Sequence, residues 1–205
     1  MKMGPFLEHT AAGTRLELKS VRIFGRELRD AGHLTTGARG VNAPHMTPRD
    51  LAAMLLALLA TDRPSRAAEM VEYFGGMQLA HPDTWASGGT LPADPDHTLL
   101  ELMEVVCDPA VRLPGGLRIA FHGTLHAVVS NEDPGDGEGL SFTYHDRAEM
   151  ERLLETGSSD LLSWHGIQTT REIGGASLQA MKDAIFGTAA QPRPVTATQG
   201  KELPA

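Results

Sequence analysis

Apolar residues recur at helical spacing in the first half of the chain. Segment 20–31 has them at intervals of three or four positions: Val21, Phe24, Leu28 and Ala31. Ser20 is a suitable N-cap and Gly32 a suitable stop, so the pattern predicts a helix over 20–31. We expect residues 1–13, which glycine and proline interrupt, to be a loose arm. Residues 14–19 fit either a strand or an early turn of the next helix.

A second helix is predicted to begin at Thr47. Thr47 can cap it, Pro48 suits the first helical position, and Asp50 suits the third. The decapeptide at 51–60 is apolar on every side, so this helix must be surrounded by protein. A third helix is expected over 65–74. Residues 77–96 are rich in proline and glycine, and we interpret them as a linker or surface loop.

The period of the pattern changes to two in the second half of the chain. Apolar residues occupy odd positions in 117–121 and 125–129 and even positions in 140–144. This alternation predicts strands, and the shared odd parity favours a three-residue loop at 122–124 or one long bent strand. Helices are expected over 97–108, 147–155 and 177–186, and a strand over 161–173 with a bulge near Gly166.

These elements together predict an α+β fold, in which an N-terminal helical bundle precedes a small antiparallel sheet with two packed helices. We expect a helical, basic region over 1–76, the linker over 77–96, and an α+β domain over 97–187. The tail at 188–205 has too few large apolar residues for a core, so we expect it to be disordered or bound to a partner.

Charge is divided unevenly along the 205 residues. The net charge is −8, yet residues 1–66 carry ten Lys/Arg against six Asp/Glu. A basic front and an acidic back suggest either two separate functions or one basic surface patch on an otherwise acidic protein. The single cysteine, Cys107, excludes an internal disulfide, and we expect it to be a buried small residue. With no membrane-length apolar run and no secretory signal, we expect a cytoplasmic protein of bacterial or viral type with no membrane partner.

Arginines are the candidate binding residues. Three lie on the face of helix 20–31 opposite its apolar residues: Arg22, Arg26 and Arg29. A helix that began at Thr14 would extend this row through Arg15 and Lys19. Two more arginines lie further on: Arg39 in the Gly-Arg-Gly loop, and Arg49. Such a row suits contacts with the phosphates of DNA or RNA, whereas the alternative is a solvated face beside Glu27 and Asp30.

A helix-turn-helix made from helices 20–31 and 48–61 is one way to arrange these arginines. The connection between them is about fifteen residues, whereas the motif uses three or four. The second helix is also too apolar to read DNA. The basic first helix or the Gly-Arg-Gly loop would then have to do so.

Signs of catalysis are weak. The sequence has neither a Gly-x-Ser-x-Gly nucleophile elbow nor a dinucleotide-type glycine motif. We therefore expect no enzymatic activity and no cofactor. A metalloenzyme is the weakest alternative. It would use three histidines that fall on the polar parity of their strands: His122, His126 and His145.

Two phrases resemble segments of uncharacterised bacterial prophage and phage proteins. The first contains GARGVNAPHMTPRDLAAMLLALLATD, and the second is TTREIGGASLQAMKDAIFG. This resemblance implies a phage setting, in which small proteins are mostly regulators, packaging factors, particle components or host-defence antagonists. The order of helices and strands also resembles a small packaging-terminase subunit, which implies a DNA-binding front, an oligomerising middle (a homo-oligomer) and a β-type back.

The first hypothesis is therefore a non-catalytic, phage-type nucleic-acid-binding protein whose DNA contacts come from the basic half. The alternative is a protein–protein interaction in which the acidic C-terminal half docks on a basic partner, for example as a particle component or host-defence antagonist. That surface would use an acidic row on helix 97–108: Glu101, Glu104 and Asp108.

Overall fold

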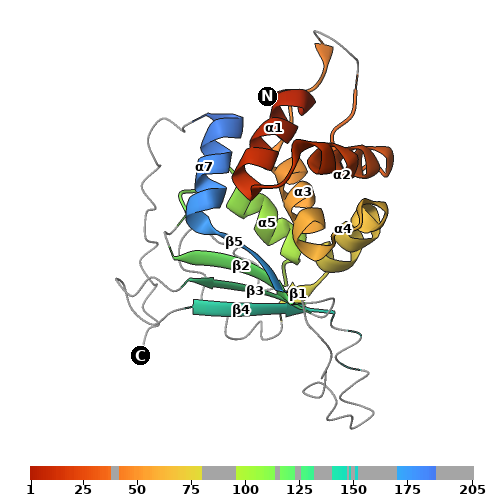
Figure 1. Cartoon of the computed structure of the whole chain (residues 1–205). Helices are drawn as coiled ribbons and strands as arrows, with labels where there is room; N and C mark the ends of the chain where they lie inside the picture. The colour runs from red at the N-terminus through yellow and green to blue at the C-terminus, as the bar shows by residue number, and fades with distance from the viewer. Residues whose placement is uncertain are drawn as a thin grey trace, which may run out of the picture.

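Helices lie on one side of an antiparallel sheet in the computed structural model (Figure 1). It describes residues 1–37, 42–79, 96–113, 116–122, 126–131, 140–146, 148, 151 and 170–187. The helices are α1 (Met3–Thr14), α2 (Leu18–Asp30), α3 (Pro48–Ala60), the short 3₁₀ helix η2 (Pro64–Arg66), α4 (Ala67–Gly75), α5 (Leu99–Cys107) and α7 (Gly175–Phe186). The strands are β1 (Gln78–Leu79), β2 (Leu117–His122), β3 (His126–Asn131), β4 (Leu140–His145) and β5 (Thr170–Gly174). The predicted α+β class, with helices before the sheet, is confirmed.

The five described strands run in the order β1-β4-β3-β2-β5, and every neighbouring pair is antiparallel. In the β2–β3 hairpin, Phe121 pairs with Ala127 and His122 with His126, so three residues, 123–125, connect the strands. The predicted loop length is confirmed, but its position is one residue later than expected. An odd loop length pairs odd positions with odd ones, which is why one parity supplies the buried face of both strands.

β1 corrects one boundary of the predicted linker. Gln78 pairs with His145 and Leu79 with Tyr144, so residues 78–79 are an edge strand of the sheet. Leu79 is buried there, whereas composition alone marked the whole of 77–96 as a connection. The short strand was hidden because two residues are too few to show a period.

α3 is the centre of the helical layer. Its residues from Asp50 to Ala60 are all buried, as its apolar sequence predicted. It packs against α2, α4 and α5 on its sides and reaches β2 and β5 of the sheet. The predicted start is also confirmed, because Thr47 and Asp50 form a capping box with Pro48 in the first turn.

The expected loose arm at 1–13 is wrong, because most of it forms α1. Pro5 lies in the first turn of the helix, where a backbone N–H has no intrahelical partner to lose. The buried residues of α1 are spaced by one, three and one: Phe6, Leu7, Thr10 and Ala11. α1 packs against α2 and α7, so its stability comes from tertiary contacts that local propensity does not report.

α2 begins two residues before Ser20, at Leu18, with Glu17 as its N-cap. The expected cap at Ser20 is therefore wrong. A helix running on from Thr14 is wrong too, because Arg15 ends α1. The predicted stop is confirmed: Gly32 has a φ of 84°, and the N–H of His33 donates to the carbonyl of Leu28.

Buried side chains from both halves of the chain form one apolar cluster, from Phe6 in α1 to Ile185 in α7. Gly13 of α1 lies so close to α7 that an added Cβ would be 2.5 Å from Cε of Met181. The division into regions 1–76 and 97–187 stays a prediction about folding units. In space, α1 contacts α7 and α3 contacts α5.

α7 carries a buried charge that the sequence pattern did not predict. The Nζ of Lys182 donates to the carbonyl oxygens of Val106 (2.8 Å) and Val111 (2.6 Å), at and after the end of α5. Burial lowers the pKa of this lysine. Cys107 is buried nearby, and burial raises its pKa to about 12. The expectation that Cys107 is a buried small residue is confirmed.

Several predictions fall outside the described residues. These are Arg39, most of helix 147–155, the bulge near Gly166, the tail at 188–205 and the linker from residue 80 to 95.

Candidate nucleic-acid interface

α1 and α2 are joined by a turn of three residues, Arg15 to Glu17. The turn begins with a C-terminal cap in which Arg15 has a φ of 58° and the N–H of Leu16 donates to the carbonyl of Ala11 at 3.1 Å. This is the six-to-one hydrogen bond of a Schellman motif, which ends a helix sharply. α2 then runs across the direction of α1 (Figure 1). A connection of three residues is within the length that a helix-turn-helix uses.

A glycine lies where α2 packs against α1 and α3. A Cβ added at Gly25 of α2 would lie 2.8 Å from Cδ2 of Leu7 in α1 and 3.3 Å from Cε of Met54 in α3. α2 buries Val21, Phe24 and Leu28 along this same face. Its opposite face is therefore held towards solvent by a fixed contact with both neighbouring helices.

The solvent face of α2 carries a row of cations: Lys19, Arg22, Arg26 and Arg29. Side chains of the three arginines are 58%, 60% and 48% exposed. The structure thus brings together the three arginines that the helical period predicted. Arg15 does not extend the row, because it lies in the turn with left-handed backbone geometry.

Each of these arginines has a carboxylate partner. Arg22 lies 3.6 Å from Glu8 of α1. Arg26 donates to Glu27 at 2.9 Å, and this hydrogen bond raises the pKa of Arg26. Arg29 donates from Nε (3.0 Å) and Nη2 (2.8 Å) to one oxygen of Asp30. Glu8 was missed by sequence reasoning, because residues 1–13 were not expected to form a helix beside α2.

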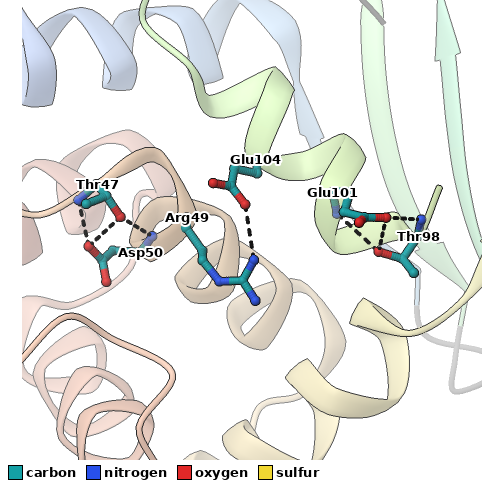
Figure 2. Close-up of polar contacts among 6 residues, drawn as sticks. All are labelled: Thr47, Arg49, Asp50, Thr98, Glu101 and Glu104. Atoms are coloured by element: carbon teal, nitrogen blue, oxygen red, sulfur yellow. Dashed lines mark hydrogen bonds and ion pairs between the residues drawn. The ribbon is translucent and has the colours of Figure 1, made fainter. Parts of the chain in front are cut away.

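Arg49 belongs to a different part of the surface. It extends from the start of α3 towards α5, where its Nη1 lies 3.2 Å from Oε2 of Glu104 (Figure 2). The next residue, Asp50, turns the other way and accepts hydrogen bonds from Thr47 and Thr35. Of the five predicted binding residues, three therefore share one helix face, Arg49 lies elsewhere, and Arg39 is outside the described residues.

The acidic row of α5 makes contacts within the chain. Glu101 accepts from the N–H and hydroxyl of Thr98 in a second capping box, and Glu104 pairs with Arg49 (Figure 2). Asp108 accepts from the N–H of Ala110 at 2.7 Å. Glu101 and Asp108 thus contribute to the ends of α5 and Glu104 ties it to α3, and a docking role for the three carboxylates stays a prediction.

The three predicted histidines do share one face of the sheet. His122 pairs with His126 across β2 and β3, and His126 pairs with His145 across β3 and β4. The rings of His122 and His126 are stacked, with centroids 4.9 Å apart. Burial first, and then the two neighbouring histidines, lower the pKa of His126. Within the described ranges, no three His, Cys, Asp or Glu side chains are arranged to hold a metal ion.

A hollow of about 510 Å³ lies beyond this end of the sheet. It is lined by the end of α4, the start of β1 and residues after β4: Glu72, Tyr73, Gly76, Met77, Gln78, Asp146, Ala148 and Glu151. Its carboxylates make it acidic, which disfavours a phosphate-bearing ligand there. The exposed arginines of α2 therefore remain the better candidate surface for a polyanion.

Comparison with known proteins gives no further indication. No family model, curated protein or solved structure matches the chain. The resemblance to prophage and phage proteins thus stays a prediction. Among the described helices, none has both the length and the apolar character needed to cross a lipid bilayer.

Proposed function

We propose that this protein binds double-stranded DNA through the α1–turn–α2 unit, with α2 as the helix that enters the major groove. The observation that carries the proposal is the three-residue turn, which joins α1 to a helix whose solvent face bears Lys19, Arg22, Arg26 and Arg29. This arrangement removes the objection that a fifteen-residue connection raised for a motif built from α2 and α3.

The shape of α2 favours DNA over duplex RNA. The major groove of B-form DNA is wide enough to admit a helix, whereas the major groove of A-form RNA is too narrow and deep. In a helix-turn-helix the second helix lies in that groove while the first crosses the backbone. Arg22, Arg26 and Arg29 would then contact phosphates or base edges along one side of the groove. A regulator and a packaging factor would both use such a surface.

The sheet face opposite the helices is a less suitable DNA surface. Arg118 on β2 is there, and it lies 3.7 Å from Glu172 on β5. Arg171 of β5 pairs with Phe121 and so lies on the other face of the sheet. Histidines and small residues surround Arg118 on β2, β3 and β5. Arg118 is 47% exposed, close to the exposure of the α2 arginines, so Arg118→Gln provides a control for the loss of one exposed arginine elsewhere on the surface.

The test is a fluorescence anisotropy titration with a labelled random duplex of two helical turns, about 20 base pairs. It compares the unaltered protein, the triple variant Arg22→Gln/Arg26→Gln/Arg29→Gln, and the control Arg118→Gln. We expect salt-weakened binding, with affinity at least about 10-fold lower in the triple variant and a salt slope reduced by up to about three. The control should bind as the unaltered protein does.

Equal binding by the unaltered protein and the triple variant would contradict the proposal, and so would an equal loss in the control. A single-stranded probe and an RNA duplex of the same length complete the comparison. Tighter binding to either of them would contradict the assignment to duplex DNA.

A further inference from the structure

The surface formed by α1 and α2 carries almost as many acidic side chains as basic ones. Residues 3–30 contain five basic side chains and four acidic ones. Three of those acids are the partners of the exposed arginines: Glu8, Glu27 and Asp30. A surface that relied on phosphate attraction alone would gain from leaving its guanidinium groups unpaired.

We propose that Glu8, Glu27 and Asp30 compete with phosphate for the α2 arginines and so suppress sequence-independent DNA binding. The inference rests on the proposed function, because it concerns how the same surface is regulated. Its consequence is selectivity: a random duplex offers only phosphates in exchange for the carboxylates, whereas a cognate duplex also offers base edges.

The physical basis is the release of counterions. Most sequence-independent affinity arises when lysine and arginine displace cations condensed on the DNA. An arginine paired with a carboxylate brings a fixed negative charge to the same place. When a phosphate takes the guanidinium, that carboxylate remains close to it, and the two anions repel each other. This repulsion reduces the binding free energy that each arginine–phosphate contact contributes.

The geometry of the three pairs supports competition and also permits displacement. Asp30 accepts two hydrogen bonds from Arg29, so it occupies the fork of donors that a phosphate would use. Glu27 occupies Nη2 of Arg26 at 2.9 Å. Glu8 reaches Arg22 from α1, so the turn between the helices positions it. All three arginines are about half exposed or more, so a phosphate can approach them from solvent.

The test removes the competing charges and leaves the arginines in place. The variant Glu8→Gln/Glu27→Gln/Asp30→Asn is compared with the control Asp62→Asn/Glu104→Gln/Glu172→Gln. The control makes the same change in net charge and removes one carboxylate contact from each of three other arginines: Arg171, Arg49 and Arg118. Binding to a random duplex is measured at about 50 and 200 mM salt by fluorescence anisotropy. Far-UV circular dichroism verifies that each variant is folded, and Asp30→Asn alone serves as a milder version.

We expect the first variant to bind the random duplex at least about 10-fold more tightly at the lower salt, with a steeper salt slope. The control should change by less than about threefold, which is the effect of net charge alone. Tighter binding by the variant than by the unaltered protein, with the control unchanged, would support the proposal.

An unchanged affinity in the variant, alongside the expected loss in the Arg22/Arg26/Arg29 variant, would overturn this inference and leave the proposed function standing. An equal gain in the control would also overturn it, because general charge would then be the cause. No binding by any of the proteins would overturn both the inference and the proposed function.

Discussion

Asp50 shows how much one side chain contributes to the helical layer. Its side chain is 2% exposed, and its carboxylate accepts from the N–H and hydroxyl of Thr47 and from the N–H and hydroxyl of Thr35. The first pair begins α3 and the second fixes the chain that leaves α2. A buried carboxylate is stable there because all of these donors, and the start of a helix, face it.

Replacing Asp50 with alanine should lower the free energy of unfolding by about 2–4 kcal/mol, since a cap and buried charge-assisted hydrogen bonds are lost together. Urea denaturation measures the change. Glu101→Ala is the control, because Glu101 holds the same position in a capping box on the surface, where about 1 kcal/mol is expected. Equal losses in the two variants would show that the tie to Thr35 contributes nothing.

His126 makes stability depend on pH. Burial and the neighbouring histidines lower its pKa below the ordinary value of 6.5, so the unfolded chain binds a proton more readily than the folded one. The stability is therefore complete above about pH 6.5 and falls as the pH drops through the lowered pKa. Urea midpoints between about pH 7.5 and 5 should decrease, and His126→Gln should flatten the decrease. The same decrease in the variant would contradict this assignment.

At the scale of elements, the sequence predicted best those segments that are buried on all sides or on one whole face. α3 is buried all round, and an unbroken apolar run with a cap before it is visible without knowing its neighbours. The hairpin β2–β3 is covered on one face, so its parity reveals the loop length. α1 was missed because Gly13 and Pro5 look unfavourable until Met181 of α7 and the first helical turn explain them.

The same distinction applies to the candidate site: features within one helix were predicted from the sequence, and contacts between helices were not. The α2 arginines follow from the period of a single helix, so the sequence was sufficient to group them. The contact between Arg22 and Glu8, and the direction of Arg49 towards α5, depend on how separate helices pack. The spacing of residues along the sequence does not predict how separate helices pack.

The contact between α1 and α2 gives a test at this scale. Gly25→Val places a branched side chain against Leu7 and Met54, which should cost about 1–3 kcal/mol and change the angle of α2. DNA affinity should fall with no change in charge. Gly4→Val is the control, because a Cβ there meets nothing within 4 Å. Thermal melting measures the stability and fluorescence anisotropy the DNA affinity. A Gly25→Val protein with unaltered stability and affinity would contradict the close packing of α2 against α1 and α3.

At the scale of the whole molecule, the helical layer and the sheet share one apolar cluster. α3 packs against α5 and reaches β2 and β5, so half of its cover comes from residues beyond position 79. We therefore expect the fragment 1–79 to lack cooperative folding, because it would expose a helix that is apolar on every side. A fragment that gives a sigmoidal urea transition by circular dichroism would show instead that the basic half folds as an independent domain.

The central claim is that α2 is the surface that meets duplex DNA. The most direct measurement is amide hydrogen exchange of the full chain with and without a saturating random duplex. We predict slower exchange confined to α1, the turn and α2, residues 3–30, and strongest in α2, with little change in β2, β3 and β5. Protection centred on the outer face of the sheet, or no protection anywhere, would contradict the account.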